Sequence, residues 1–374
     1  MLHRTIRVSL PGDSTPTSDR SYDIVIGAGA TGSIGAALRA AGAQRAVVIA
    51  DSAIVEPYAA RVAAVLGAAE IDAAMLAVPA GEASKSVAEA SRLWSELARL
   101  AVDRGTHVVA VGGGVVGDLA GFVAATFVRG LPVWQVPTTL VAQVDSAIGG
   151  KTGINLSAGK NLVGAFWQPR GVFADIDTLA TLPRREFTSG LAEVVKYGMI
   201  LDADFFHWLE AHAARILARD TAALVHVVER SAALKAQVVE RDEHERTGLR
   251  AVLNYGHTFG HAFETAAGYG TLLHGEAVAI GMAAAAQLAE RLGRIGPDIV
   301  SRQQHLLTAF ELPATVAAYG RLAKPATADD LLAIMARDKK TLGGRLRFVL
   351  PSRIGHVELV DGVDSALVRR VLGM

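Results

Sequence analysis

The amino-acid sequence predicts an α/β N-terminal domain with a mostly parallel, Rossmann-like sheet, followed by a mainly α-helical C-terminal domain. A chain of 374 residues is longer than one hydrophobic core usually serves, so two domains are expected. In the first half, short apolar runs alternate with helical patterns, which is typical of a parallel sheet covered by helices. Beyond residues 181–187 the pattern is almost entirely helical. We place the domains at residues 1–179 and 180–374.

Six apolar runs of the first half are predicted to be β-strands, because each is short and bounded by turn residues. They read YDIVI, AVVIA, AMLAV, HVVAV, PVWQV and VFADI. Intervening segments such as residues 86–102 carry apolar residues at helical spacing and are predicted helices. Helices are expected to about residue 337, followed by a strand pair, RLRFVLP and HVELV, and a last helix near residues 364–372.

Composition places the chain among folded proteins that bind small molecules. Hydrophobic residues make up 51% and charged residues 20%, and the formal net charge is zero. Nothing therefore favours a nucleic-acid partner or an anionic membrane. The first residues contain no apolar core of signal-peptide type, and no apolar run approaches the roughly 18 residues of a membrane span. The chain has no cysteine, which suits a cytoplasmic protein. We expect a cytoplasmic protein without a membrane or nucleic-acid partner.

Two glycine-rich turns compete as a phosphate-binding site. GAGATG, at residues 27–32, follows an apolar run, and Asp51 ends a second run about twenty residues later, as in dinucleotide-binding folds. VGGGVVGDLAG, at residues 111–121, places three glycines between a strand and a helix, where backbone N–H groups and the helix dipole favour an anion. The second turn is the stronger candidate, because an ordinary strand-to-helix turn needs one glycine rather than three. Asp118, one helical turn further on, could accept a hydrogen bond from a ribose or an amide.

Polar residues gather at residues 135–161 beside an apolar run. Asp145, Lys151, Lys160 and Asn161 cannot be deeply buried there without partners. Two lysines, an amide and several glycines suit a phosphorylated polyol, whereas a solvated loop is the alternative.

A third group of residues suits a metal ion. Glu193 and Lys196 stand three residues apart on one helical face, which alone is more often a surface ion pair than a site. His257 and His261 have the i, i+4 spacing of a helical metal pair, and His274 precedes the next predicted helix. Three imidazoles and one carboxylate suit Zn²⁺ with a coordination position left for substrate, and spacing alone would make His261 a ligand.

Taken together and in this order, the motifs resemble those of the 3-dehydroquinate synthase family, within the sugar phosphate cyclase superfamily. The resemblance covers essentially the whole chain and includes PAGEASKS, GGGVVGDLAGF, QVPTTLVAQVDSAIGGKTGIN, GLAEVVKYG, LNYGHTFGHAFE, LHGEAVAIGM and RDKKTLGGRLRFVLP. It implies a lyase of the shikimate pathway, which leads to chorismate and the aromatic amino acids, with NAD and Zn²⁺ or Co²⁺ as cofactors. The family converts 3-deoxy-D-arabino-heptulosonate 7-phosphate to 3-dehydroquinate and phosphate. The steps are transient oxidation by NAD, phosphate elimination, re-reduction, ring opening and an intramolecular aldol reaction.

The resemblance also implies a role for each matching residue. The implied NAD site comprises Asp51, Gly81, Glu82, Lys85, Gly113, Gly114, Val115, Val116, Gly117, Asp118, Thr138, Thr139, Lys151, Lys160, Thr178, Leu179, Ala180 and Thr181. The implied substrate and catalytic residues are Asp145, Lys151, Asn161, Lys196, Lys235, Arg250, Asn254, His261, Lys339 and Arg129. The implied metal ligands are Glu193, His257 and His274.

Three consequences of the resemblance modify the reading of the motifs. His261 becomes a proton-transfer residue rather than a ligand. Arg129 is implied to reach the site from the partner subunit of a homodimer. The pyrophosphate is expected at residues 113–116, while the GAGATG turn is expected to follow an edge strand and to bind no phosphate, although Asp51 still meets the ribose.

Other functions remain open from the sequence. A cyclase acting on a neutral sugar phosphate would share the NAD and metal sites but would not need Lys235 and Arg250, which the family uses for a carboxylate. The stretch ERDEHERTGLR also allows Arg250 to pair with Glu243 or Glu245 at the surface. A metal-dependent polyol dehydrogenase would share the two-domain plan but release NADH, and a catalytically inactive binding protein would not need this set of charged motifs.

Overall fold

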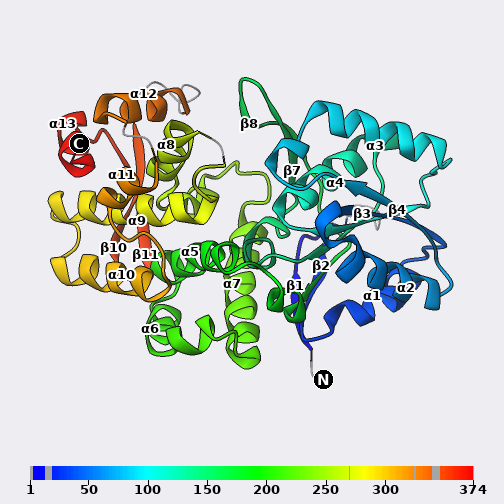
Figure 1. The fold of residues 1–374 in the computed structure, drawn as a ribbon. Helices are drawn as coiled ribbons and strands as arrows, with labels where there is room; N and C mark the ends of the chain where they lie inside the picture. Colours follow the sequence, from blue (N-terminus) through cyan, green and yellow to red (C-terminus); the bar gives the residue numbers. More distant parts are fainter. Residues whose placement is uncertain (1–2, 13–18, 269, 324–325, 339–345, 374) are drawn as a thin grey trace. The chain divides into compact units, whose positions relative to one another are not determined.

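The computed structural model describes residues 3–12, 19–268, 270–323, 326–338 and 346–373. The chain forms two compact units, Met1–Leu182 with Leu224–His244 and Pro183–Ala223 with Glu245–Met374. The predicted fold class is confirmed, because a mostly parallel sheet with helices is followed by a helix-rich region (Figure 1). The sequence prediction kept residues 224–244 in the C-terminal domain, whereas the compact units group them with the N-terminal residues. They form most of α7 (Thr221–Arg241).

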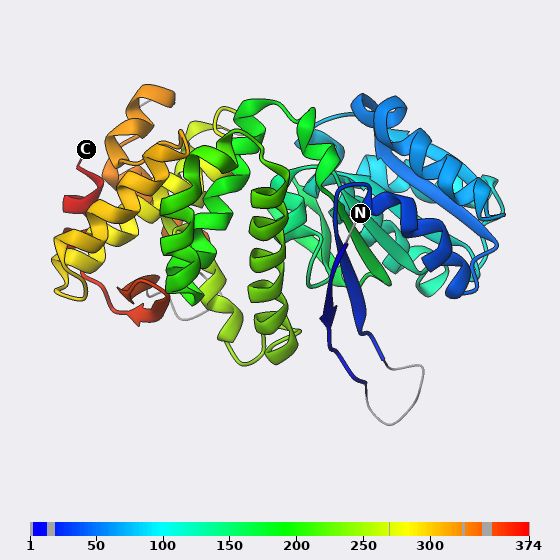
Figure 2. The same ribbon diagram turned by 90° about the horizontal axis from the view of Figure 1, so that it is seen from below.

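The first unit contains a seven-stranded sheet with the order β1-β2-β9-β6-β5-β3-β4. Its strands are β1 (Arg4–Val8), β2 (Tyr22–Gly27), β3 (Arg45–Asp51), β4 (Asp72–Val78), β5 (His107–Gly112), β6 (Val133–Pro137) and β9 (Gly171–Asp175). All six predicted strands are present. The additional strand, β1, pairs antiparallel with β2 at the edge of the sheet (Figure 2, dark blue). The expectation that the GAGATG turn follows an edge strand is therefore wrong, since β2 lies between β1 and β9.

Helices cover both faces of this sheet, with one hydrophobic core between the sheet and the helices on each face. The covering helices are α1 (Ile34–Ala40), α2 (Ala60–Ala68), α3 (Val87–Arg99) and α4 (Gly114–Thr126). Because successive strand residues point to opposite faces, Val47 and Ile49 of β3 share a core with α3 and α4. Val48 and Ala50 share the other core with α1 and α2. The sheet is thus buried on both sides, which explains its continuous apolar runs.

The strand order reverses between β3 and β5. From β3 the chain moves outward to β4, whereas from β5 it moves the other way to β6 and later β9. These strands are parallel, so their carboxyl ends share one edge. Ligands of open α/β sheets bind outside the carboxyl ends at such a reversal. Asp51 ends β3 there, and β5 leads into Gly113.

The polar stretch that follows β6 contains a hairpin that was not predicted. Its strands are β7 (Lys151–Leu156) and β8 (Gly159–Phe166), paired antiparallel in a sheet of their own. β8 alternates half-buried and exposed residues rather than buried and exposed ones. Its sequence therefore lacks the apolar alternation by which a strand is normally detected.

The second unit packs its helices around α9 (His274–Arg291), which is almost entirely buried from Gly275 to Ala289. The other helices are α5 (Arg184–Leu201), α6 (Ala203–Leu217), α8 (His257–Ala267), α10 (Pro297–Ala309), α11 (Tyr319–Leu322), α12 (Ala328–Asp338) and α13 (Ser365–Leu372). The predicted strand pair is present as β10 (Arg347–Arg353) and β11 (His356–Asp361). Helices α5, α8 and α10 all contact α9 (Figure 1). Within the described ranges, no helix is long and apolar enough to span a membrane.

Candidate active site

Three potential metal ligands meet in the second unit. They are Glu193 on α5, His257 at the start of α8 and His274 at the start of α9, and one ligand atom of each lies within 4.8 Å of the others. The Nε2 atoms of His257 and His274 lie 3.5 Å and 3.4 Å from Oε1 of Glu193. Two ligands of a tetrahedral zinc ion, each at about 2.0–2.1 Å, are about 3.4 Å apart. The spacing of these atoms therefore fits one Zn²⁺ ion.

The surroundings of the two histidines set their protonation. Burial lowers the pKa of His257 to about 3, although Glu193 opposes this effect. Its Nδ1 lies 3.1 Å from the carbonyl oxygen of Tyr255. Because a carbonyl can only accept, Nδ1 carries the proton and Nε2 keeps the lone pair that binds a metal. Burial also lowers the pKa of His274, but hydrogen bonding to Glu193 and Glu264 outweighs it and raises that pKa to about 10. A metal binding there must displace a proton.

Lys196 lies beside Glu193 and is equally buried. Its side chain is 2% exposed, that of Glu193 is 0% exposed, and Lys196 Nζ forms an ion pair with Glu193 Oε2. The histidines approach the other oxygen, Oε1. The interpretation as a surface ion pair is therefore wrong. A buried carboxylate needs cationic partners, and this arrangement leaves Oε1 facing the two imidazoles.

The start of α9 is fastened to α5, the helix that carries Glu193. Arg185 donates two hydrogen bonds to Glu276, at 2.7 and 2.8 Å. The backbone N–H of Gly275 donates to the Ser189 hydroxyl at 3.0 Å, and a Cβ atom at residue 275 would come within 1.8 Å of the Ser189 carbonyl oxygen. Only glycine fits this close approach, so the packing of the two helices fixes the position of the preceding residue, His274.

His261 lies next to the cluster but outside the group of ligand atoms. Its ring centre is 5.4 Å from that of His257 and 6.3 Å from that of His274, and its side chain is exposed. Among the described residues, the group within mutual reach of one ion contains Glu193, His257 and His274. The i, i+4 spacing therefore identifies a neighbour of the cluster, and its role in proton transfer stays a prediction.

The residues predicted to bind NAD lie along the carboxyl edge of the sheet in the first unit. Asp51 ends β3, Gly113 precedes α4, Thr138 and Thr139 follow β6, and residues 178–181 follow β9. The N-cap residue of α4 is Gly113, which has no side chain that could cap the helix. The first N–H groups of that helix are thus placed to bind an anion. Residues 114–117, which include Val115, Val116 and Gly117, form its first turn.

Charged residues of this predicted NAD site pair with one another. Lys85, 5% exposed, forms an ion pair with Asp118, whose pKa is raised by burial and lowered by that lysine. Lys160 Nζ lies 3.7 Å from Glu82 Oε1, which also accepts a 2.7 Å hydrogen bond from the Asn155 amide. The backbone N–H of Asn155 in turn donates to the Lys85 carbonyl at 2.8 Å. Asn155, which the sequence did not single out, therefore links the two pairs, next to the turn that begins at Gly81.

The GAGATG turn already binds an anion that belongs to the protein. Asp175 Oδ1 accepts from the backbone N–H of Gly29 at 2.9 Å, and Oδ2 accepts from the backbone N–H of Thr31 at 3.1 Å and its hydroxyl at 2.5 Å. Asp175 ends β9 and is 4% exposed. Its carboxylate takes the hydrogen-bond donors that a pyrophosphate would need. Sequence reasoning missed Asp175 because it lies 146 residues from Gly29.

Two further residues hold the segment after β9. The Tyr58 hydroxyl donates to the carbonyl of Thr178 at 3.2 Å and contacts the Thr181 hydroxyl. Gln143, which is 0% exposed, donates to the Thr178 hydroxyl at 3.1 Å and to the carbonyl of Asp175 at 2.9 Å. Neither was singled out from the sequence, although a glutamine within the run LVAQV was a detectable signal. They fix the backbone that also carries Leu179 and Ala180.

Of the predicted substrate residues in the first unit, the structure brings two together. Lys235 Nζ donates to both Oδ1 and the backbone carbonyl of Asp145, each at 2.7 Å. Lys151 begins β7 and is exposed, and Asn161 on β8 has a left-handed φ of 55°. Arg129 is exposed in a turn with a φ of 70°, and its reach into a partner subunit stays a prediction.

The second unit holds the remaining predicted substrate residues. Arg250 lies in a short 3₁₀ helix (Leu249–Asn254), and its Nε is 3.7 Å from Glu245 Oε1. The contact with Glu245 was foreseen, but the Arg250 side chain is 1% exposed and so is not at the surface. Asn254 ends this helix and is exposed. Lys339 lies outside the described residues.

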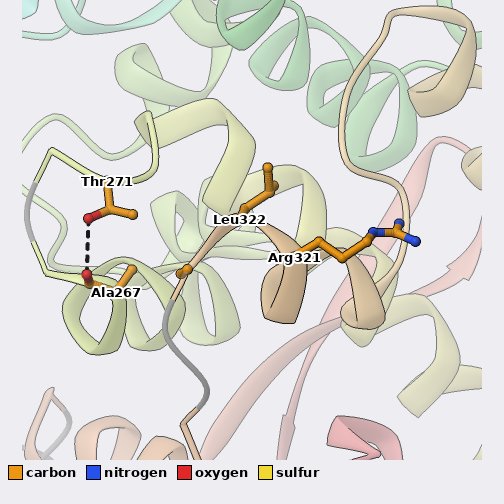
Figure 3. A pocket seen from close by; sticks show the side chains of 5 residues that line it. Ala267, Thr271, Arg321 and Leu322 are labelled. Atoms are coloured by element: carbon orange, nitrogen blue, oxygen red, sulfur yellow. Dashed lines mark hydrogen bonds between the residues drawn. The ribbon is translucent and has the colours of Figure 1, made fainter.

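The hollow drawn in Figure 3 is separate from these residues. It is lined by Ala267, Thr271, Arg321, Leu322 and Ala323, and the Thr271 hydroxyl donates to the Ala267 carbonyl at 3.0 Å (Figure 3). It lies at the C-terminal end of α8, whereas the metal cluster uses the N-terminal end. None of the predicted site residues lines it, and we assign it no part in the reaction.

Comparison with known proteins decides the family. Residues 75–189 match the family described as 3-dehydroquinate synthase N-terminal, and residues 190–341 match the one described as 3-dehydroquinate synthase C-terminal. The 3-dehydroquinate synthase of Rhodopirellula baltica is 48% identical over 357 residues, covering 94% of this chain and 93% of that protein. The chain belongs to the 3-dehydroquinate synthase family. The 3-dehydroquinate synthase of Desulforamulus reducens is 47% identical over 355 residues, covering 95% and 97%.

Solved structures place the family member among sugar phosphate cyclases. A 2-deoxy-scyllo-inosose synthase complexed with carbaglucose-6-phosphate, NAD⁺ and Co²⁺ is 28% identical with a TM-score of 0.87, covering 99% of both chains. The 2-epi-5-epi-valiolone synthase of Streptomyces hygroscopicus, with NAD⁺ and Zn²⁺ bound, is 27% identical with a TM-score of 0.85, covering 98% of both. A probable glycerol dehydrogenase from Sinorhizobium meliloti, at 16% identity and a TM-score of 0.58 over 93% and 94% of the chains, shares the fold alone.

Proposed function

We propose that this protein is a 3-dehydroquinate synthase, a lyase that converts 3-deoxy-D-arabino-heptulosonate 7-phosphate to 3-dehydroquinate and phosphate in the shikimate pathway. The observation that carries the proposal is the 48% identity, over 94% of the chain, with a protein of that name. We assign NAD binding to the α/β domain of residues 1–179 and metal and substrate binding to the helical domain of residues 180–374. Because residues 224–244 belong to the first compact unit, Lys235 belongs to the unit that contains the α/β domain.

Both cofactors fit the residues that would hold them. Bound NAD supplies reversible hydride transfer, and Zn²⁺ or Co²⁺ polarises a substrate oxygen. Glu193, His257 and His274 would hold the metal, because their ligand atoms have the spacing of one tetrahedral ion. Gly113 and the first turn of α4 would hold the pyrophosphate, and Asp51 the ribose. The NAD⁺ and metal ions of the related cyclases support the same pair here.

The substrate carries a carboxylate and a phosphate, and each needs cationic groups because an unpaired buried anion is costly. We assign Lys235 and Arg250 to the carboxylate. Asp145 orients Lys235 through its two 2.7 Å hydrogen bonds, and the planar guanidinium of buried Arg250 can hold a carboxylate through two parallel bonds. We assign the phosphate to Lys151, Asn161, Lys339 and Arg129 of the partner subunit. His261 would move a proton near the metal, with Lys196 and Asn254 orienting the reacting end.

We further propose that the protein is a cytoplasmic homodimer. Val128 and Arg129 have φ values of 44° and 70°, a left-handed backbone that costs roughly 1–2 kcal/mol per residue. Such strain persists where a function requires it. This supports the proposal that the exposed Arg129 reaches into the site of the partner subunit. The absence of cysteine and the zero net charge support a cytoplasmic protein that binds small molecules.

A cyclase acting on a neutral sugar phosphate is the second candidate, favoured by the TM-score of 0.87 with 2-deoxy-scyllo-inosose synthase. The identity of 28% with that enzyme, against 48% with a 3-dehydroquinate synthase, favours the acid substrate. The test is to incubate purified protein, NAD and Zn²⁺ with the acid substrate or with neutral sedoheptulose 7-phosphate and to identify the products by mass spectrometry. We expect 3-dehydroquinate from the acid and little product from the neutral sugar. Preference for the neutral sugar would refute the proposal.

A further inference from the structure

A buried carboxylate lies on the far side of His274 from the metal cluster. Glu264 of α8 is 8% exposed, and its Oε2 lies 3.6 Å from Nδ1 of His274. The other ring nitrogen, Nε2, lies 3.4 Å from Glu193. His274 is thus held between two carboxylates, one on each nitrogen. Glu264 stands seven residues after His257 on α8, which places the two on the same helical face.

The two histidines have equivalent surroundings built from different groups. His257 faces Glu193 through Nε2, while its Nδ1 is held at 3.1 Å by the Tyr255 carbonyl. His274 faces Glu193 through Nε2, while its Nδ1 is held by the Glu264 carboxylate. His274 also needs the restraint more, since its side chain is 41% exposed against 12% for His257. A partly exposed imidazole that is not held loses more conformational freedom when it binds a metal than a buried one does.

We propose that Glu264 is the positioning residue of His274, holding the proton on Nδ1 so that Nε2 is presented to the metal. The proposal rests on the metal site described above and adds a residue to it. Carboxylates in this position orient a ligating histidine and increase its basicity, and their loss typically weakens metal affinity by 10–100-fold. Glu264 lies outside the group of potential ligands found among the described residues, and its contact with that group at Nδ1 of His274 is the route by which it acts on metal affinity.

The test is zinc binding by the full chain stripped of metal, measured by competition with a chelator of known affinity. Glu264→Gln keeps the side-chain shape and removes the charge, and we expect its dissociation constant for zinc to rise about 10–100-fold. Glu210→Gln is the matched control. Glu210 lies on α6, also a helix of the second unit, and accepts a 3.0 Å hydrogen bond from Arg302. It does not belong to the group of potential metal ligands found among the described residues. We expect this control to change the zinc dissociation constant less than twofold. The melting temperature of the metal-free protein is measured alongside for both variants.

The outcomes separate positioning from a structural role. Glu264→Gln with wild-type zinc affinity, or with a loss no larger than that of Glu210→Gln, would overturn the inference. Should Glu264→Gln fail to fold, Glu264→Asp keeps the charge but withdraws it by one methylene group. We expect faster zinc release from it than from the wild type, and an unchanged rate would overturn the inference. A wild-type protein that binds no zinc would instead refute the proposed function.

Discussion

The same substitution in the two glycine-rich turns would show which of them binds NAD. Gly114 begins α4, and a Cβ atom there would lie 2.9 Å from the Ser146 hydroxyl oxygen. In Gly114→Val, the branched side chain would crowd the helix N-terminus at a packing cost of about 1–3 kcal/mol. Gly32 is the third glycine of GAGATG, and a Cβ atom there would meet nothing within 4 Å. Gly32→Val should therefore change the free energy of unfolding by no more than about 0.5 kcal/mol.

The expected effect on NAD follows from the hydrogen bonds at each turn. Displacing the pyrophosphate from α4 removes at least two charge-assisted hydrogen bonds of about 1.5 kcal/mol each. Their sum, about 3 kcal/mol, corresponds to a roughly 100-fold weaker dissociation constant for Gly114→Val. Gly32→Val should bind NAD within twofold of the wild type, because Asp175 already takes the donors of that turn.

Calorimetric titration with NAD measures both constants, and urea unfolding shows whether each variant is folded. A third variant, Gly29→Ala, meets no neighbour within 4 Å but has a φ of 70°. It should lose about 1 kcal/mol of stability and keep its NAD affinity. Equal losses of NAD affinity in Gly32→Val and Gly114→Val would show that the GAGATG turn also binds the cofactor.

Other predictions concern the metal and the substrate. Chelation should abolish activity, and Zn²⁺ or Co²⁺ should restore it, while His274→Ala should lose bound metal as measured by elemental analysis. Unchanged metal content in that variant would contradict the ligand assignment. Arg250→Met should lower kcat/KM for the acid substrate by roughly 100-fold or more, because breaking a buried charged pair costs about 3–5 kcal/mol. Turnover of a neutral sugar phosphate, if detectable, should fall far less, and an unaffected acid reaction would exclude Arg250 from the carboxylate site. Lys235→Met should raise KM for the acid substrate, and an unchanged KM would show that Lys235 serves Asp145 alone.

The strands and helices could be predicted because their signals are local. Every apolar run that was read as a strand is one, and the sheet buried on both faces explains why those runs are continuous. The strands β1 and β8 escaped because their residues are largely exposed or half-buried. β7 escaped because its three buried residues, Thr152, Gly153 and Ile154, include only one large apolar side chain. The grouping of residues 224–244 with the first unit depends on contacts made far along the chain. A helical pattern shows that a helix has an apolar face but does not show what covers it.

The candidate site follows the same division between local and long-range information. Spacing singled out His257, His261 and His274, but it also suggested His261 as a ligand, and His261 lies outside the group of ligand atoms found among the described residues. In the sequence alone, Glu193 and Lys196 were interpreted as a surface ion pair. Only the fold shows that Glu193 is buried against two imidazoles. Asp175 carries no motif of its own. The donors that it satisfies lie in the turn that follows β2, far from Asp175 in the chain, so no local pattern could reveal that the GAGATG turn is filled.

The proposed reaction uses NAD as a recycled cofactor and involves no net oxidation. One reaction tests it: 3-deoxy-D-arabino-heptulosonate 7-phosphate in large excess over NAD, with phosphate release and NADH absorbance followed together and a parallel reaction without NAD. We predict that phosphate release depends on NAD, exceeds the amount of NAD many times over, and proceeds without accumulation of NADH. NADH that accumulates in step with turnover, or the absence of NAD-dependent phosphate release, would show that the protein does not catalyse the proposed reaction.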